Sequence, residues 1–328
     1  MVSGPNRRPQ RDEGLPHHDF GPRGRAPRLA LVADLDGREL NGMFVLSRLA
    51  AFLRGVEAGE RRGLSLREHV VIVPTVGNWK GRGAGMRRVV PARTANERRR
   101  RGGVTTEAVM EITQTAYYRV AIHPVSLDVE EMPQLCLYAP SDDERASACL
   151  FGLPAVIERP VEDESTPDLV RAWRFRGGEN FVIHGGQAGG LQTGHCETLF
   201  RALVAFLDRT GILGGLRLVG EEEPLRYFGA QQVVAVRAGR AGIFSSNLDV
   251  GRWIQTGEEL GRIHDGFTGG VRARVTAPAS GVLASLRRQP LLGEQDLVAR
   301  ILAPAAADGG ERVRREALRD GRPGEPRV

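Results

Sequence analysis

The stretch ALVADLDGRELNGMFVLSRLAAFL, residues 30–53, decides the fold that we expect of this chain. A largely apolar run over residues 29–35 meets a tight polar turn, and apolar residues at helical spacing follow Asn41 and Gly42. A buried strand that turns directly into a helix is typical of open α/β sheets, whose ligands bind at the carboxyl ends of the strands. The carboxylates of Asp36 and Glu39 lie at such an end, so they are candidates for chemistry.

These two carboxylates have two interpretations. Their oxygens can converge on one metal ion, because both residues belong to the same turn. Alternatively, Asp36 only turns the chain, and Glu39 lies in the solvated first turn of the helix, where its negative charge suits the helix dipole. The stretch by itself leaves both interpretations open.

Further buried strands follow, each closed by turn residues. The runs HVVIVPTV (residues 69–76), AYYRVAIHP (116–124), PAVIERP (154–160) and ENFVIHGG (179–186) predict strands, and residues 194–213 have the apolar spacing of a helix. Alternating strands and helices predict a three-layer α/β domain with a mixed sheet over residues 28–218. Two of the strands end in histidine, at His123 and His184, and these ends are expected to gather beside the two carboxylates.

The pattern changes near Leu225 to short Val-rich runs separated by glycines, which predicts an all-β domain over residues 219–303. The phrases DVGRWIQTGEELGRI and APASGVLASL resemble the half-barrel hammerhead of biotinyl and lipoyl carrier domains. No lysine lies at a hairpin tip there, so we expect no covalently carried cofactor. Residues 1–27 and 304–328 are polar, and we expect a disordered arm and a disordered tail.

Composition limits the classes of protein. A chain of 328 residues with 41% hydrophobic and 5% aromatic residues fits a globular protein of two domains. No apolar run approaches the ~20 residues that cross a membrane, and the N-terminus lacks the apolar segment of a secretory signal. Three cysteines without C-x-x-C spacing indicate reduced thiols and a cytoplasmic location. The net charge of +6 comes with no nucleic-acid-binding motif, so we expect neither nucleic acid nor membrane as a partner.

The order of these motifs resembles the succinylglutamate desuccinylase/aspartoacylase family. The features that carry the resemblance are DLDGRELNG, a strand ending in valine and proline, an arginine loop in GMRRVVP, the strand end VAIHP, the run VIHGGQAGGL and the C-terminal hammerhead. The resemblance spans Arg28 to Leu302. It implies a zinc-dependent deacylase with a three-layer, mixed-sheet, carboxypeptidase-like α/β domain followed by a small all-β hammerhead or half-barrel domain.

The resemblance also implies a metal site. The family's first metal histidine falls on Asp36, its metal glutamate on Glu39 and its second metal histidine on His123. Zinc is the metal that the resemblance implies. With two carboxylates, the ligands are chemically harder than those of the family. Such a site would bind iron or manganese more readily than the family's own site does.

The catalytic and substrate-binding residues also follow from the resemblance. The catalytic glutamate falls on His184, or on Gln187 in a shifted alignment. His184 is either a base in place of that glutamate, a fourth metal ligand or a hydrogen-bonded residue at a strand end. The arginine that stabilises the oxyanion and binds the substrate carboxylate matches Arg88. Neighbouring or loose counterparts for substrate binding are Arg87, Asn96 and Arg98.

These features predict a divergent hydrolase that acts on a C–N bond other than a peptide bond, namely an amide next to a carboxylate. The expected partner is a small-molecule or peptide carboxylate, such as an N-acyl amino acid, and an oligomer is compatible with the sequence. Two alternatives stay open. One is a catalytically impaired pseudoenzyme that only binds a partner, and the other is a biosynthetic enzyme with a repurposed metal site.

Overall fold

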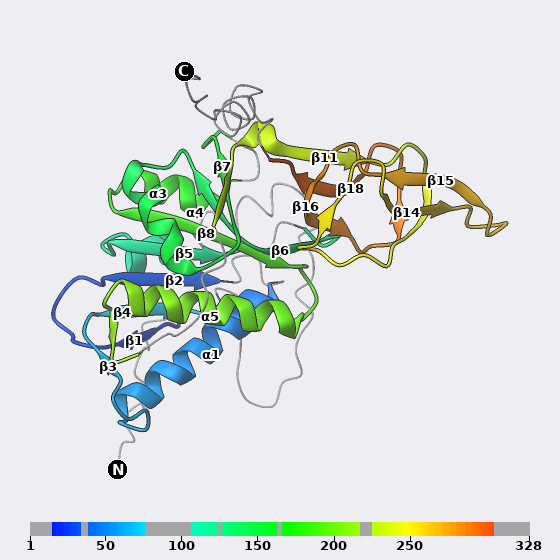
Figure 1. Cartoon of the computed structure of the whole chain (residues 1–328). Coiled ribbons are helices and arrows are strands. Elements are labelled where there is room, and N and C mark those ends of the chain that lie inside the picture. Colours follow the sequence, from blue (N-terminus) through cyan, green and yellow to red (C-terminus); the bar gives the residue numbers. More distant parts are fainter. Residues whose placement is uncertain are drawn as a thin grey trace, which may run out of the picture. The chain divides into compact units, whose positions relative to one another are not determined.

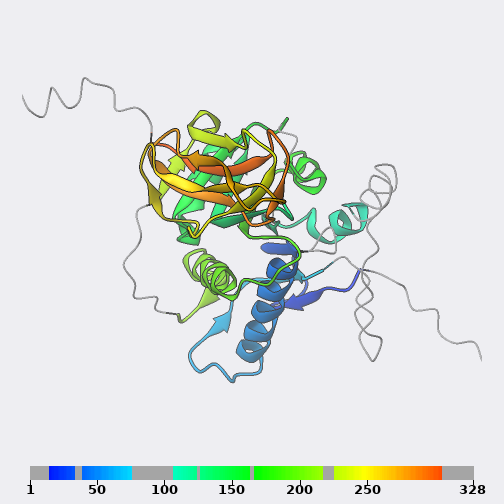
Figure 2. The same cartoon turned by 90° about the vertical axis from the view of Figure 1, so that its right-hand side faces the viewer.

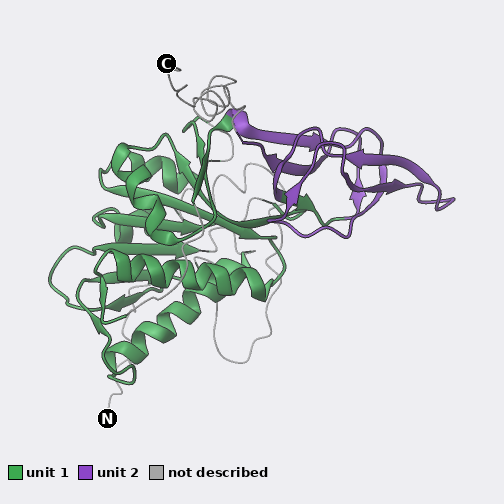
Figure 3. Cartoon of the chain, in the orientation of Figure 1, with its two compact units in different colours: residues 1–230, 285–289 green, residues 231–284, 290–328 purple. Residues whose placement is uncertain are grey.

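The computed structural model describes residues 15–33, 39–75, 106–123, 126–162, 166–216 and 225–304. The chain divides into two compact units, shown in Figure 3. Unit 1 comprises residues 1–230 and 285–289, and unit 2 comprises residues 231–284 and 290–328. The predicted boundary lay at residues 218/219.

Unit 1 is built on a mixed sheet. Its strands lie in the order β1 (His18–Phe20), β4 (Val70–Val73), β2 (Leu29–Ala33), β5 (Tyr118–Ile122), β8 (Glu179–Gly186) and β6 (Val129–Tyr138). Strands β4, β2, β5 and β8 are parallel, whereas β1 and β6 run antiparallel to their neighbours. Beyond β6, β7 (Ala155–Arg159) and β10 (Arg226–Phe228) add parallel pairings, and β3 (Ser65–Leu66) pairs with β9 (Leu213–Gly214). The predicted mixed α/β sheet is confirmed.

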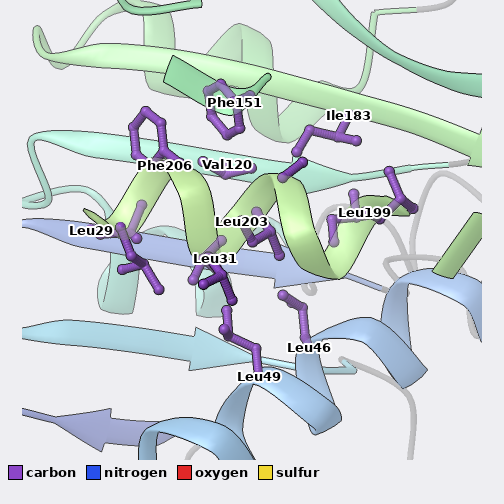
Figure 4. Packing of buried hydrophobic residues seen from close by; sticks show 14 of the residues in the cluster. Leu29, Leu31, Leu46, Leu49, Val120, Phe151, Ile183, Leu199, Leu203 and Phe206 are labelled. Atoms are coloured by element: carbon purple, nitrogen blue, oxygen red, sulfur yellow. The ribbon is translucent and has the colours of Figure 1, made fainter. Parts of the chain in front are cut away.

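Two long helices, α1 (Leu40–Glu57) and α5 (Thr193–Arg209), lie side by side on one face of this sheet, as Figure 1 shows. Their apolar residues recur at helical spacing, so each helix buries one stripe against the strands. Figure 4 shows Leu46 of α1 and Leu203 of α5 among the buried side chains of the strands. Gly42 permits this close approach, because a Cβ atom there would lie 3.0 Å from the Cβ of Ala33.

The other face of the sheet carries a second helical layer. Side chains alternate along a strand, so Arg119 of β5 points away from the face that Val120 packs on. The Nε of Arg119 donates to the Thr113 carbonyl over 3.2 Å, at the end of a helix over residues 106–113. Trp173 of α4 (Asp168–Arg174) donates to the Thr113 hydroxyl over 2.9 Å. A shorter helix, α3 (Asp142–Ala148), begins with a capping box and continues into the 3₁₀ turn η1 (Cys149–Phe151).

The described part of unit 2 consists mainly of strands, which are coloured yellow to orange in Figure 2. After the 3₁₀ turn η2 (Ala230–Gln232) they are β11 (Val233–Arg237), β12 (Gly242–Ser245), β13 (Trp253–Ile254), β14 (Glu259–His264), β15 (Val271–Thr276), β16 (Gly281–Arg287), β17 (Leu291–Leu292) and β18 (Leu297–Leu302). Four of them form a sheet in the order β15, β14, β12 and β17.

Strand β16 is divided between the two units. Its residues 281–284 belong to unit 2, where Gly281 pairs with Ile254 of β13. Its last residues, 285–287, belong to unit 1, where they pair antiparallel with residues 129–131 of β6. The C-terminal segment is therefore rich in strands, as predicted, but a separate small all-β domain is not confirmed. Within the described ranges, no helix is long and apolar enough to span a membrane.

Candidate functional site

The direction of the strands brings the candidate residues to one edge of the sheet of unit 1. Because β2, β5 and β8 are parallel, the residues that follow their carboxyl ends meet at the same edge. Strand β6 runs antiparallel to β8, so its first residues lie at that edge as well. Glu39 follows β2, His123 follows β5, and His184 lies near the end of β8.

Glu39 and His123 are in contact. Glu39 is the residue before the first turn of α1, and its side chain makes no capping hydrogen bond. It is only 2% exposed, and its Oε1 atom forms an ion pair with Nδ1 of His123. The backbone amide of His123 is fixed separately, since it donates to the Ile183 carbonyl over 2.9 Å. The alternative of a solvated Glu39 in the first helical turn is wrong, because the carboxylate is buried against an imidazole.

His184 lies beside this pair. Its ring is edge-on to that of His123, with 6.4 Å between the ring centroids. His184 is 1% exposed, and its Nδ1 atom lies 3.2 Å from Oε2 of Glu131, which is buried to the same extent. Burial disfavours the charged imidazole, but the Cys136 thiol and the Glu131 carboxylate raise the pKa of His184 to about 10.

Asn41 holds the start of α1 to the loop after β8. Its Nδ2 atom donates to Oε1 of Gln192 over 2.5 Å, and its Oδ1 atom accepts from the backbone amide of Gln192 over 2.8 Å. The thiol of Cys196 lies 3.3 Å from the same oxygen. Gly186 has a φ of +81°, and a Cβ atom there would lie 2.3 Å from Nδ2 of Asn41. This cluster fixes the backbone that follows Glu39 and the backbone that follows His184.

Five of the predicted site residues fall outside the described part of the chain: Asp36, Arg87, Arg88, Asn96 and Arg98. Within the described residues, no group of three or more His, Cys, Asp or Glu side chains could hold a metal ion. Glu39 and His123 supply one carboxylate and one imidazole nitrogen. These donor types fit zinc, iron or manganese.

Residues of β6 are absent from the sequence-based site, although they lie at its edge. Glu131 bonds to His184, and Glu130 bonds to Nε2 of His195 over 2.7 Å. The run VEEMPQLCLY contains adjacent glutamates and a proline, which are unfavourable in a strand. The sequence pattern therefore does not predict β6. A register shift between Glu131 and Gln134 accommodates Pro133. The signal that a reader of the sequence could use is the pair of carboxylates directly before an apolar run.

Three solved structures are similar in fold to this chain. The product-bound ectoine utilization protein of Ruegeria pomeroyi is 19% identical with a TM-score of 0.64, over 88% of this chain and 89% of that chain. A succinylglutamate desuccinylase/aspartoacylase of Rhodobacter sphaeroides is 19% identical with a TM-score of 0.62, over 85% and 86%. An aspartoacylase family protein of Mesorhizobium loti is 15% identical with a TM-score of 0.61, over 89% and 90%.

No family model matches the chain, and no curated protein matches its sequence. Many of the similar structures are succinylglutamate desuccinylase/aspartoacylase family proteins, at low sequence identity over most of the chain. The fold that defines this class is therefore the fold of the present chain. The resemblance seen in the sequence is confirmed at this level.

Proposed function

We propose that this protein is a divergent metal-dependent deacylase or amidohydrolase that cleaves an amide next to a carboxylate, in an N-acyl amino acid or a peptide-like substrate. The observation that supports the proposal most directly is the contact between buried Glu39 and His123 at the carboxyl edge of parallel strands. Buried carboxylates are retained where they are paired or bind metal. The names of the similar structures support a deacylase-like function.

In this proposal Asp36, Glu39 and His123 hold the ion, which is zinc or, because two ligands are carboxylates, iron or manganese. Such an ion, when bound, acidifies a coordinated water and polarises the amide carbonyl. Glu39 and His123 are suited to hold it because their donor atoms already meet away from solvent.

The remaining residues bind substrate and move the proton. Nδ1 of His184 donates to Glu131, so Nε2 is the ring nitrogen at which His184 takes up or releases a proton. Arg88, with Arg87 beside it, binds the substrate carboxylate and the oxyanion, because a guanidinium pairs with carboxylates through two parallel hydrogen bonds. Asn96 and Arg98 complete the substrate contacts. We also propose that the C-terminal strands form a hammerhead and that the protein is located in the cytoplasm.

Metal analysis of the purified protein, combined with turnover of N-succinyl-L-glutamate and N-acetyl-L-aspartate, tests the proposal. We expect a bound divalent ion that is lost in Glu39→Gln and in His123→Ala, and slow hydrolysis that requires the ion. His69→Ala is the matched control, because His69 pairs with Asp19 over 3.0 Å elsewhere in unit 1. Metal content that is the same in all four proteins, or turnover that survives His123→Ala, would overturn the proposal. Metal binding with no turnover of any N-acyl amino acid would favour the pseudoenzyme or the biosynthetic enzyme.

A further inference from the structure

One face of the four-stranded sheet of unit 2 carries exposed apolar side chains, which we call the apolar patch: Ile243, Phe267 and Leu291. Ile243 of β12 is opposite Leu291 of β17 in the strand register, so the two side chains project to the same face. Phe267 lies in the turn between β14 and β15. This turn is beside Ile243, because a Cβ atom at Gly266 would lie 3.6 Å from Cδ1 of Ile243.

The opposite face of the same sheet packs into the core of unit 2. Phe244 of β12 and Ile263 of β14 are opposite each other in register, and both are buried. An antiparallel sheet with one face on a core usually has polar side chains on its other face. Here Phe267 is 99% exposed and Leu291 is 65% exposed on that other face. Apolar side chains that gather on a surface, with charged residues around them, are typical of a protein–protein contact.

The apolar patch has both a projection and a groove. The projection is the ring of Phe267, since nearly all of its surface is exposed. Beside it lies an open groove of about 600 Å³, whose lining includes the glycines Gly242, Gly266 and Gly293 and therefore leaves room for a side chain from outside. The charged residue of the lining, Asp296, accepts from the backbone amide of Gly293 over 2.8 Å. A surface with a projection next to a groove can bind a copy of itself, because each copy supplies what the other lacks.

In the described part of unit 2, charged residues beside the patch alternate in sign across one end of the sheet. In strand order they are Arg272 in β15, Asp265 after β14, Arg240 before β12 and Glu294 after β17. Arg272 pairs with Asp265 over 2.6 Å, and Arg240 pairs with Glu294 over 3.8 Å. A guanidinium nitrogen of Arg272 also donates to the Ala241 carbonyl over 3.2 Å, so the two ion pairs lie next to each other.

We propose that the apolar patch binds a second copy of this chain in a two-fold contact. A two-fold axis that runs along the strands, between β14 and β12, reverses the order of the charges in the facing copy. Arg272 then meets Glu294 of the second copy, and Asp265 meets Arg240 of the second copy. The same rotation carries Phe267 from the β14 side of one sheet to the groove on the β12 side of the other.

The alternating charges favour a second copy over a partner of a single sign. An acidic peptide or a nucleic acid would be repelled by Asp265 and Glu294, whereas the two-fold contact sets opposite charges against each other throughout. The proposal goes beyond the proposed function, because no residue of the apolar patch belongs to the candidate site.

Sedimentation velocity of the full-length protein over a range of concentrations tests the proposal. We expect a monomer–dimer equilibrium whose dissociation constant rises about tenfold or more in Phe267→Ser. Phe175→Ser is the matched control, because Phe175 is also exposed, at 88%, but belongs to unit 1. Circular dichroism should show wild-type folding for both variants, since neither ring is packed in a core.

An exchange of charges tests the two-fold arrangement. Arg272→Glu and Glu294→Arg should each weaken dimerisation, because each sets like charges against one another. An equimolar mixture of the two variants should dimerise more tightly than either variant alone, since the substituted residues then meet each other and the unchanged residues meet each other. Mixing cannot restore the pairs within a chain, where Arg272 and Glu294 have different partners.

Three results would overturn the proposal. The first is a wild-type chain that stays monomeric at every concentration, which would leave the patch to a partner of another kind. The second is a Phe267→Ser variant that dimerises as wild type does. The third is a mixture of the two charge variants that dimerises no better than they do alone.

Discussion

In the alignment that the resemblance implies, Asp36 falls on a metal-binding histidine of the family, and His184 falls on its catalytic glutamate. An additional carboxylate neutralises more of an ion's charge, so a bound water is acidified less. Loss of the glutamate removes a general base, which is typically worth ~10²–10⁴ in rate. Both changes predict that wild type hydrolyses ordinary N-acyl amino acids slowly.

The double substitution Asp36→His with His184→Glu should therefore raise kcat/KM for such substrates, by about 10² or more. Steady-state kinetics on N-succinyl-L-glutamate and N-acetyl-L-aspartate measures this. Adding His123→Ala to the double variant is the control, and it should abolish the gain. A double variant that is no faster than wild type would show that the alignment of these two positions is wrong.

Asn41 contributes to stability through hydrogen bonds that are not visible in the sequence. The residue is 1% exposed and bonds both to the side chain and to the backbone amide of Gln192. Asn41→Ala should lower the free energy of unfolding by about 2–3 kcal/mol, because it leaves buried partners unsatisfied. Chemical denaturation measures the change. Gly186→Ala should be at least as damaging, since its Cβ would collide with Asn41, and a neutral effect of both would contradict the role given to this contact.

Glu130 supplies a pH-dependent contribution to stability. Hydrogen bonds from His195 and from Arg288 hold its pKa below the ordinary value of 4.5, although burial opposes them. A carboxylate with a lowered pKa in the folded state stabilises the protein above its unfolded pKa, and this contribution is lost as the pH falls through the folded pKa. Glu130→Gln should cost about 1–3 kcal/mol at pH 7. Urea titrations of both proteins should converge as the pH falls below 4.5 and through the lowered pKa of Glu130, and a gap that stays constant throughout the acid titration would refute the assignment.

At the level of secondary structure, local pattern predicts the central strands well. Residues 179–186 form β8 with the predicted bounds, and the predicted runs at 69–76, 116–124 and 154–160 contain β4, β5 and β7. Their apolar residues are buried on both faces, so the runs are continuous and easily recognised. The helix predicted to follow Gly42 includes that glycine, since α1 begins at Leu40.

The local sequence pattern does not predict strand β6, because the partners of this strand are distant in the sequence. Its first residues pair with β16, more than a hundred residues later, and carry glutamates whose partners are His184, His195 and Arg288. Tertiary contacts of this kind override local strand propensity. The same holds for the candidate site, in which Glu39 and His123 are predicted from strand ends, whereas Glu131 is found only from the strand register.

Packing between α5 and the sheet depends on a cluster of aromatic rings. Phe206 is fully buried and stacks on Phe151 with 4.1 Å between centroids, and Figure 4 shows both rings. Phe206→Ala should lower the free energy of unfolding by about 3–5 kcal/mol, because it opens a cavity in the core. Phe200→Ala on the same helix is the control and should cost less, since Phe200 is only partly buried. Equal losses in thermal or urea denaturation would contradict the cluster's importance.

For the whole molecule, the division of the chain predicts that unit 1 needs residues from beyond Ala230. Residues 285–289 return to unit 1, where Ser285 pairs with Glu131 and the Nε atom of Arg288 lies 2.5 Å from Glu130. A chain that ends at residue 230 lacks these contacts and exposes the edge of β6, which is a template for unwanted strand pairing.

We therefore expect a 1–230 fragment to melt at a lower temperature than the full chain and to self-associate. A 1–304 fragment, which keeps both segments of unit 1, should behave as the full chain does. Differential scanning fluorimetry and size-exclusion chromatography of the three proteins measure this. A monodisperse 1–230 fragment that melts together with the full chain would show that β16 is dispensable for unit 1. Reduced stability of that fragment, with 1–304 unaffected, would instead show that unit 1 depends on a strand contributed from late in the sequence.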